Sequence, residues 1–372
     1  MKRHSNLYEQ VYNIHNLEAA DRQASLGKSK QPGVIKHRQN PDMNLMALQN
    51  ILMDKTYRTS PYVTATIHDP KERTIYCLPY FPDRIVHHAI VNVMKPIWVS
   101  TFTADTYSCI EGRGVHKASY RLRKALKNQS ETTYCLKLDI VKYYPSVDHG
   151  ILKTIIRKKI KDQDMLNILD EIIDSAPGLP IGNYLSQYLA NLYLTYFDHW
   201  VKENLGVKHY FRYADDMVFL SSSKTELHTI LAKVRTYLRE KLNLQVKGNY
   251  QVFPVAKRGI DVFGYIHYHH HTLLRKSIKQ RFARMLAKRP NRASIAAYNG
   301  WAKHCNSKHL IKKLNDQFQG LKHQGRNERL CRQEDGNNRY PEHRNHSTRL
   351  EGRKEHHQTR TGPKLPSPIV RT

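Results

Sequence analysis

Two adjacent carboxylates stand in a stretch of sequence that is largely aromatic and aliphatic. Asp215 and Asp216 occupy the middle of residues 211–220, with apolar residues on both sides. Removing an ionised carboxylate from water is unfavourable, and two neighbouring carboxylates also repel each other. A divalent cation would supply the missing counter-charge, so the pair predicts a metal site. The alternative is a solvated hairpin turn, where Asp is common because it tolerates unusual backbone angles.

A third acid follows another strand-like segment. Residues 134–138 alternate apolar and polar side chains, as expected of a half-buried strand, and Asp139 comes directly after them. Residues 211–220 are typical of a strand, a tight turn and a second strand, which places Asp215 and Asp216 at the tip. Two strands that end in acids indicate one metal centre, and hard carboxylate oxygens favour Mg²⁺.

The sequence around these acids resembles the reverse transcriptase family. The match to the catalytic box of that family is residue by residue, and its other boxes follow in order over about residues 50 to 310. The catalytic box consists of Tyr213, Ala214, Asp215 and Asp216. The resemblance implies an α+β fold of the right-hand polymerase type, with fingers, a palm built on an antiparallel sheet and a small helical thumb. Periodicity supports only the local elements, and a fold does not by itself fix a function.

The resemblance also implies two-metal nucleotidyl transfer. A primer 3′-hydroxyl would attack the α-phosphorus of a deoxynucleoside triphosphate beside two Mg²⁺ ions. The predicted catalytic residues are Asp139, Asp215 and Asp216. The predicted metal site comprises Asp139, its neighbour Ile140, Asp215 and Asp216.

Four further residues are predicted to bind nucleotide or template. Lys71 and Arg73 lie between two alternating runs that resemble the fingers hairpin, whose basic tip would hold phosphate oxygens. Tyr144 occupies the position where such polymerases place a ring against the sugar 2′ carbon, so the product should be DNA. Lys247 is a candidate donor to the leaving pyrophosphate. The alternatives are a solvated tip, a core tyrosine and a solvated lysine.

The chain departs from most reverse transcriptases at the loop before a predicted helix. Most members carry Gln-Gly and Ser-Pro there, whereas this chain has Ile181-Gly182 and Ser186-Gln187. This variant resembles the enzymes of diversity-generating retroelements, whose cDNA carries errors opposite template adenines. Ile181, Gly182 and Gln187 are therefore predicted to contact the nascent base pair, where an aliphatic side chain cannot hydrogen-bond the nucleotide. The alternative is an ordinary core isoleucine.

The subclass resemblance implies particular partners. They are a template RNA and its RNA–DNA duplex, deoxynucleoside triphosphates, and a small, basic, helical accessory protein. Another bacterial reverse transcriptase, of the intron or phage-defence type, is the alternative enzyme. An RNA-binding scaffold with a vestigial polymerase site is the alternative from a different class, and the intact Asp139, Asp215 and Asp216 weigh against it.

Composition agrees with a nucleic-acid substrate. The 61 Lys and Arg residues outnumber the 32 Asp and Glu residues, which gives a net charge of +29. Such a charge predicts salt-dependent binding to phosphate, although a cationic membrane binder would share it. No apolar stretch is long enough to span a membrane, no signal-peptide pattern opens the sequence, and the five cysteines lack a CxxC pairing. We therefore expect a soluble protein without a membrane partner, located in a bacterial cytoplasm and encoded by the bacterium or a phage.

Four regions follow from these patterns. Residues 1–60 are predicted to form an N-terminal helical extension and residues 61–271 the interleaved fingers and palm. Basic and apolar residues interleave over residues 272–322, which predicts a helical thumb with one face toward the template–primer backbone, or merely a solvated amphipathic helix. Residues 323–372 have few large apolar side chains and are predicted to be a disordered basic tail.

Overall fold

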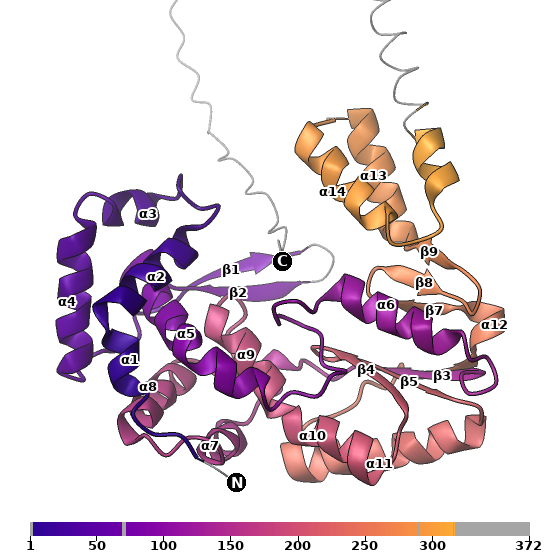
Figure 1. The fold of residues 1–372 in the computed structure, drawn as a ribbon, viewed down its shortest axis with the longest axis horizontal. Helices are drawn as coiled ribbons and strands as arrows, with labels where there is room; N and C mark the ends of the chain where they lie inside the picture. Colours follow the sequence, from indigo (N-terminus) through magenta and orange to yellow (C-terminus); the bar gives the residue numbers. More distant parts are fainter. Residues whose placement is uncertain (1–2, 69–71, 289, 315, 317–372) are drawn as a thin grey trace, which may run out of the picture. The chain divides into compact units, whose positions relative to one another are not determined.

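The fold mixes helices with antiparallel sheets, as predicted for the α+β class (Figure 1). A computed structural model describes residues 3–68, 72–288, 290–314 and 316. The chain divides into two compact units, Met1–Arg275 and Lys276–Thr372, each with its own core. In the described residues no helix is both long enough and apolar enough to cross a membrane.

Helices dominate the first part of the larger unit. The first two helices pack against a later helix, α5, and α4 packs against the first two. Leu17, Leu48 and Ile90 are completely buried in this shared core. The described part of residues 1–60 therefore shares a core with the segments that follow it. The elements are α1 (Tyr8–Tyr12), α2 (Ile14–Ser25), α3 (Pro32–His37), α4 (Pro41–Met53), the helical turn η1 (Tyr80–Arg84) and α5 (Ile85–Val99).

A two-stranded hairpin separates these helices along the chain. Its strands, β1 (Val63–Ile67) and β2 (Arg73–Cys77), are antiparallel. This confirms the hairpin that the alternating residues predicted. Arg73 is the first residue of β2. Lys71 lies outside the described residues.

The central sheet has four antiparallel strands in the order β4-β5-β3-β6. Successive side chains alternate between its faces, as the geometry of a strand requires. On one face Leu136 and Phe219 share a cluster with the long helix α11, and on the other Cys135 and Val218 share one with α6. In Figure 1 these helices lie on opposite sides of the sheet. The bounds are α6 (Val115–Leu126), β3 (Tyr134–Leu138), β4 (His209–Tyr213), β5 (Asp216–Ser221), α11 (Lys224–Leu242) and β6 (Gln251–Pro254).

Helices also fill the chain between β3 and β4. The amphipathic α7 and α8 and the buried α9 join the main core through residues such as Ile155, Leu169 and Leu189. The bounds are the turn η2 (Tyr144–Ser146), α7 (His149–Arg157), α8 (Gln163–Asp174), α9 (Tyr184–Tyr193), α10 (Thr195–His199) and the turn η3 (Trp200–Asn204).

A second, three-stranded sheet completes the larger unit. It follows the short α12 (Val255–Arg258) and consists of β7 (Ile260–Val262), β8 (Tyr265–His267) and β9 (Thr272–Leu274). Because β9 pairs with β8, residues 272–274 belong to this unit and not to the helical region that was predicted to begin at residue 272.

The smaller unit is helical where it is described. It contains α13 (Lys276–Lys288) and α14 (Arg292–Ala302). Phe282 is completely buried and its ring stacks on Tyr298, with centroids 4.8 Å apart. The predicted tail, residues 323–372, lies outside the described residues.

Candidate active site

A pocket of about 1090 Å³ brings together residues from segments that are far apart in the sequence. Its lining comes from β2, β3, the loop after β3, the loop before α9, the β4–β5 hairpin, the loop after α11, the start of β6 and the residue after β9. Seven residues singled out in the sequence lie in this lining: Arg73, Asp139, Tyr144, Ile181, Asp215, Asp216 and Lys247.

Strand register places the three acids in this pocket. Leu138 at the end of β3 pairs with Met217 of β5, so the next residue, Asp139, lies beside Asp216 on the same face of the sheet. Tyr213 pairs with Asp216, which leaves Ala214 and Asp215 as a two-residue turn. Ala214 adopts a positive φ of 53°, which is unusual for a residue with a side chain. Asp215 therefore lies in the turn itself, and Asp216 is the first residue of β5.

The carboxyl groups perturb one another. Burial raises the pKa of Asp215 to about 7, and the neighbouring carboxylates of Asp139 and Asp216 add to the effect. Burial also raises the pKa of Asp216, against the pull of Lys137. The Lys247 ammonium forms an ion pair with Asp139, and the Lys247 backbone N–H donates to the Asp139 carbonyl at 2.9 Å. Lys247 thus neutralises Asp139 directly, whereas burial disfavours the ionised forms of Asp215 and Asp216.

These acids have the chemistry of a divalent-metal site. The Asp139 Oδ1 atom is buried, and no hydrogen-bond donor of the described residues reaches it. Hard carboxylate oxygens suit Mg²⁺. As they stand, no three His, Cys, Asp or Glu side chains of the described residues are grouped so that they could hold a metal ion, and Lys247 is paired with Asp139. The donor chemistry therefore fits a divalent metal, but binding requires the three carboxylates to draw together and the Lys247 ammonium to leave Asp139.

A loop before α9 closes one side of the pocket. The Leu179 N–H donates to the Tyr144 carbonyl at 2.8 Å, and the Tyr76 N–H of β2 donates to the Ile181 carbonyl at 2.8 Å. Gly182 has a φ of +122°, and a Cβ on it would lie 2.5 Å from the Tyr76 carbonyl oxygen. The loop therefore fastens the Tyr144 turn to the β1–β2 hairpin and requires glycine to do so.

Three predicted site residues have other positions. Gln187 is exposed on α9 and does not line the pocket. Gly182 contacts β2 through its backbone and is likewise absent from the lining. Ile140 is completely buried and forms a bridge with Val246, so it supports the site from behind.

Several pocket cations were not singled out in the sequence. Lys137 shares the face of β3 with Asp139, and strand alternation two residues before Asp139 could have identified it. The exposed Lys142 has a positive φ of 40°. Arg275 donates from Nε to Asp261 at 2.5 Å, and Lys137 donates from Nζ to the carbonyl of the same residue at 2.7 Å. No local sequence signal marks Arg275, because only the β7–β9 sheet returns it to the pocket.

Comparison with known proteins identifies the family. The family model "Reverse transcriptase (RNA-dependent DNA polymerase)" matches residues 68–266, which include every residue of the pocket except Arg275. The chain belongs to the reverse transcriptase family. Membership agrees with the mixed fold and with the antiparallel sheet that carries the acids, and it confirms the predicted right-hand polymerase class.

Individual relatives of this reverse transcriptase are distant. Protein YkfC of Escherichia coli (strain K12) is 26% identical over 253 residues, which cover 56% of this chain and 64% of that protein. The group II intron-encoded protein LtrA of Lactococcus lactis subsp. cremoris is 24% identical over 163 residues, 40% of this chain and 27% of that protein. The chain thus spans less than two thirds of the length of these relatives. Among solved structures, apo telomerase from Candida tropicalis matches with a TM-score of 0.45 and 13% identity, covering 60% of this chain and 49% of that chain.

Proposed function

We propose that this reverse transcriptase is an RNA-directed DNA polymerase that extends a DNA primer along a template RNA with deoxynucleoside triphosphates. The observation that carries the proposal is the convergence of Asp139, Asp215 and Asp216 in one pocket with phosphate-binding and sugar-contacting candidates. Family membership supports the same reaction class.

The three acids would hold the metal. When bound between them, two Mg²⁺ ions would neutralise phosphate charge and lower the pKa of the primer hydroxyl. Asp139 and Asp215 are the principal ligands in this proposal, because the Asp139 carboxyl group is close enough to raise the pKa of Asp215. Asp216 completes the set from the first position of β5.

Other pocket residues would bind and orient the nucleotide. Arg73 is exposed at the start of β2 and would donate to phosphate oxygens. Lys247 would move from Asp139 to the pyrophosphate as the metal binds, because the same ammonium cannot serve both partners. Tyr144 would exclude a 2′-hydroxyl, and Ile181 would touch the nascent base pair. The role proposed for Lys71 rests on the sequence alone.

Primer extension on an RNA template tests the proposal. Asp215→Asn removes one ligand charge with almost no change in shape, so DNA synthesis should fall to background. The matched control is Asp42→Asn, which neutralises an exposed carboxylate on α4. Control activity should equal that of the unmodified protein. Synthesis by Asp215→Asn at the control rate would contradict the proposal.

Within this activity, we propose that the chain belongs to the diversity-generating subclass and works with a small basic accessory protein. Ile181 lies in the pocket wall where the family usually carries glutamine, which supports loose selection of the incoming nucleotide. Sequenced cDNA should show errors concentrated at template adenines, and Ile181→Gln should reduce that bias. A uniform error spectrum in the unmodified enzyme would contradict the subclass.

An intron-associated reverse transcriptase is the second candidate. Several relatives are intron proteins by name, including LtrA and the nuclear intron maturase 4 of Arabidopsis thaliana, which is 26% identical over 141 residues. Accurate cDNA with no adenine bias would favour this candidate.

A further inference from the structure

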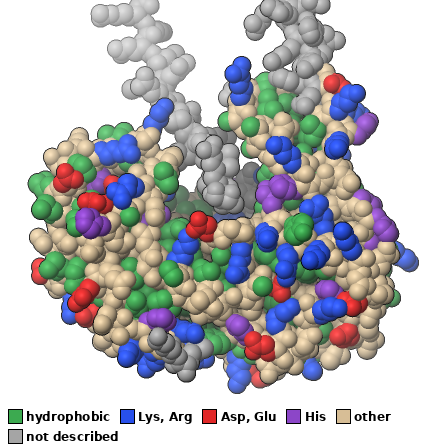
Figure 2. Space-filling view, viewed as in Figure 1, with side chains coloured by type: hydrophobic (Ala, Val, Ile, Leu, Met, Phe, Trp, Pro, Cys, Tyr) green, Lys and Arg blue, Asp and Glu red, His purple; other side chains and the backbone are tan. Residues whose placement is uncertain are grey.

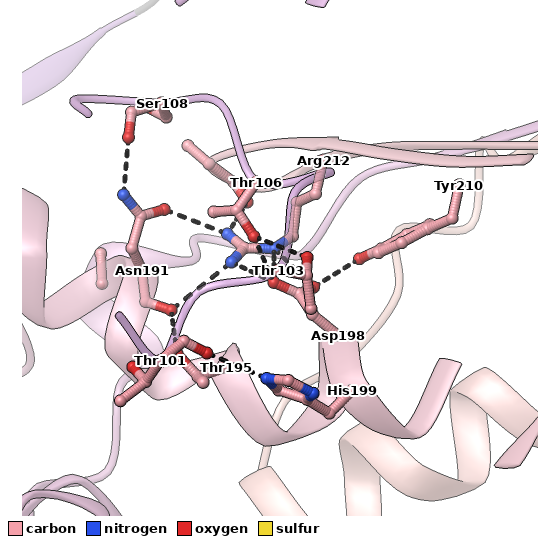
Figure 3. Close-up of polar contacts among 12 residues, drawn as sticks. Thr101, Thr103, Thr106, Ser108, Asn191, Thr195, Asp198, His199, Tyr210 and Arg212 are labelled. Carbon is pink, nitrogen blue, oxygen red and sulfur yellow. Dashed lines mark hydrogen bonds and ion pairs between the residues drawn. The ribbon is translucent and has the colours of Figure 1, made fainter. Parts of the chain in front are cut away.

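An ion pair is fully buried beneath the turn that carries Asp215. Arg212 on β4 and Asp198 on α10 both have 0% exposed side chains. The Arg212 Nε donates to Asp198 Oδ1 at 2.8 Å and its Nη2 donates to Asp198 Oδ2 at 2.5 Å. This two-bond geometry uses one edge of the guanidinium group (Figure 3).

Neighbouring hydroxyl groups complete the surroundings of Asp198. The Tyr210 hydroxyl donates to Asp198 Oδ1 at 2.7 Å and the Thr106 hydroxyl donates to Oδ2 at 2.9 Å. Both carboxylate oxygens are therefore fully used, which is the condition under which a buried ion pair is stable. Asp198 and its donors fix the orientation of the guanidinium group.

The other edge of Arg212 faces the turn. Its Nη1 donates to the Ala214 carbonyl at 3.1 Å and to Asn191 Oδ1 at 3.2 Å. The Asn191 Nδ2 in turn donates to the Ser108 carbonyl at 2.6 Å. Ala214 is the residue with a φ of 53°, directly before Asp215. Backbone in this region persists only where its surroundings hold it, and Arg212 supplies a hydrogen bond at that point.

Backbone contacts prevent Arg212 itself from moving. Its N–H donates to the Asp105 carbonyl at 2.9 Å, and its carbonyl accepts from the Tyr107 N–H at 3.0 Å. The guanidinium group is thus held by β4, α9, α10 and the segment of residues 105–108 at once. A buried ion pair is not needed for stability alone, because apolar residues of similar volume often serve equally well.

We infer that Arg212 is a positioning residue, which transmits the fixed geometry of Asp198 and Asn191 to the turn and thereby sets the Asp215 carboxylate for metal binding. Only a guanidinium group can donate to Asp198, Asn191 and the Ala214 carbonyl together. A lysine ammonium keeps the charge but lacks the planar fork. The inference rests on the proposed polymerase function.

The test compares Arg212→Lys with Arg157→Lys in the full-length protein. Arg157 also forms a two-bond ion pair, with Asp170, but it joins α7 to α8 and does not line the pocket. Three quantities are measured for each variant: Mn²⁺ affinity by titration without nucleotide, turnover in primer extension, and the thermal unfolding midpoint. Arg212→Lys should weaken Mn²⁺ binding and turnover by roughly 10- to 100-fold, as supporting residues of metal sites do. Arg157→Lys should lower only the unfolding midpoint.

A second variant keeps the test decisive where Arg212→Lys does not fold. Asn191→Leu keeps the number and branching of the side-chain heavy atoms but removes the acceptor that holds Nη1 toward the turn, so it should weaken Mn²⁺ binding in the same direction. The inference is wrong if the folded Arg212→Lys protein, or Asn191→Leu in its place, binds Mn²⁺ and turns over like the Arg157→Lys control. An unmodified protein that neither binds Mn²⁺ nor extends primers would instead contradict the proposed function.

Discussion

The Tyr144 ring reaches the pocket from a short turn that its neighbours hold on two sides. It lies edge-on to Tyr143, with ring centroids 5.7 Å apart and an interplanar angle of 72°. Its carbonyl accepts the Leu179 N–H, and a Cβ on Gly178 would lie 2.6 Å from the same oxygen. In the role proposed for it, a ring on a turn held in this way would not move aside for a 2′-hydroxyl.

Tyr144→Ala should therefore admit ribonucleotides. The ratio of kcat/KM for a deoxynucleotide to that for the matching ribonucleotide should fall by about 10- to 100-fold, because the clash and the unpaired hydroxyl disappear together. Steady-state primer extension with each nucleotide measures this ratio. Tyr144→Phe keeps the ring and should keep the discrimination. Unchanged discrimination in Tyr144→Ala would show that another residue reads the sugar.

Some site residues stand out from their neighbours in the sequence alone. Asp215 and Asp216 stand out because carboxylates in an apolar stretch need a partner, and Asp139 because it ends an alternating strand. Arg212 lies in the same stretch and was passed over. Its importance comes from Asp198 on a separate helix, and no local pattern identifies which acid a buried arginine will meet.

At the scale of elements, the loop of residues 178–183 joins the β1–β2 hairpin to the turn after β3. Both joints are backbone hydrogen bonds, from Tyr76 to Ile181 and from Leu179 to Tyr144. The loop therefore couples the β1–β2 hairpin to the sheet that carries the acids.

Gly182→Ala should break the hydrogen bond from the Tyr76 N–H to the Ile181 carbonyl. The added Cβ would meet the Tyr76 carbonyl at 2.5 Å in a backbone conformation that alanine seldom adopts, so primer extension should fall sharply. Gly206→Ala is the matched control, since Gly206 also has a positive φ of 65° but open space around it. Both variants should lose some stability, by about 1 kcal/mol or more, from backbone strain alone. Equal activity of the two variants would show that the contact between this loop and β2 is not needed for primer extension.

Another link between elements is the capping residue Asp162. Its carboxylate accepts the Met165 N–H at the start of α8 at 3.0 Å, and the Leu7 and Tyr8 N–H groups of the N-terminal segment at 2.6 and 3.1 Å. Burial pushes the pKa of Asp162 upward, but these backbone donors outweigh it and hold the pKa below its ordinary value.

Stability should accordingly depend on the ionised form of Asp162. A depressed pKa in the folded state gives stabilisation that is present above the unfolded pKa of about 3.9 and is lost as the pH falls through the lower folded value. Asp162→Ala should cost about 1 to 2 kcal/mol at neutral pH, and the deficit should shrink below about pH 4. Urea unfolding across that range measures it, with Asp42→Ala as the exposed control. A deficit independent of pH would contradict the capping role.

The sequence predicted best the elements whose strands and turn are adjacent along the chain. The β4–β5 hairpin has largely apolar arms around a short acidic turn, and the β1–β2 hairpin has two alternating runs around a basic tip. The pairing of β3 with β5 joins segments about 80 residues apart, so the sequence indicated that the acids meet without giving the register. Strands β7, β8 and β9 have three residues each, too few for a period to show, which is why the helical thumb was predicted to begin inside β9.

For the whole molecule, the charge of +29 is the dominant electrostatic fact. Part of it gathers over α6, where Figure 2 shows Lys and Arg side chains together. Lys117, Arg121 and Lys124 are exposed at helical spacing there. Such charge binds phosphate without reading sequence.

Binding of the full chain to RNA should therefore weaken steeply with salt. If about six or more phosphates are contacted, affinity should fall by about 1,000-fold or more between about 50 and 200 mM salt. Fluorescence anisotropy with a labelled RNA measures the slope. Asp139→Asn should show the same slope, because it leaves the basic surface intact. Binding that is insensitive to salt would contradict a phosphate-directed surface.

The central claim is that Asp139, Asp215 and Asp216 jointly bind divalent metal. Anomalous diffraction from crystals of the protein soaked in Mn²⁺ tests it directly. We predict Mn²⁺ peaks bounded by these three carboxylates, with the Lys247 ammonium moved away from Asp139. A pocket without Mn²⁺, in which Lys247 still pairs with Asp139 at saturating metal, would contradict the account.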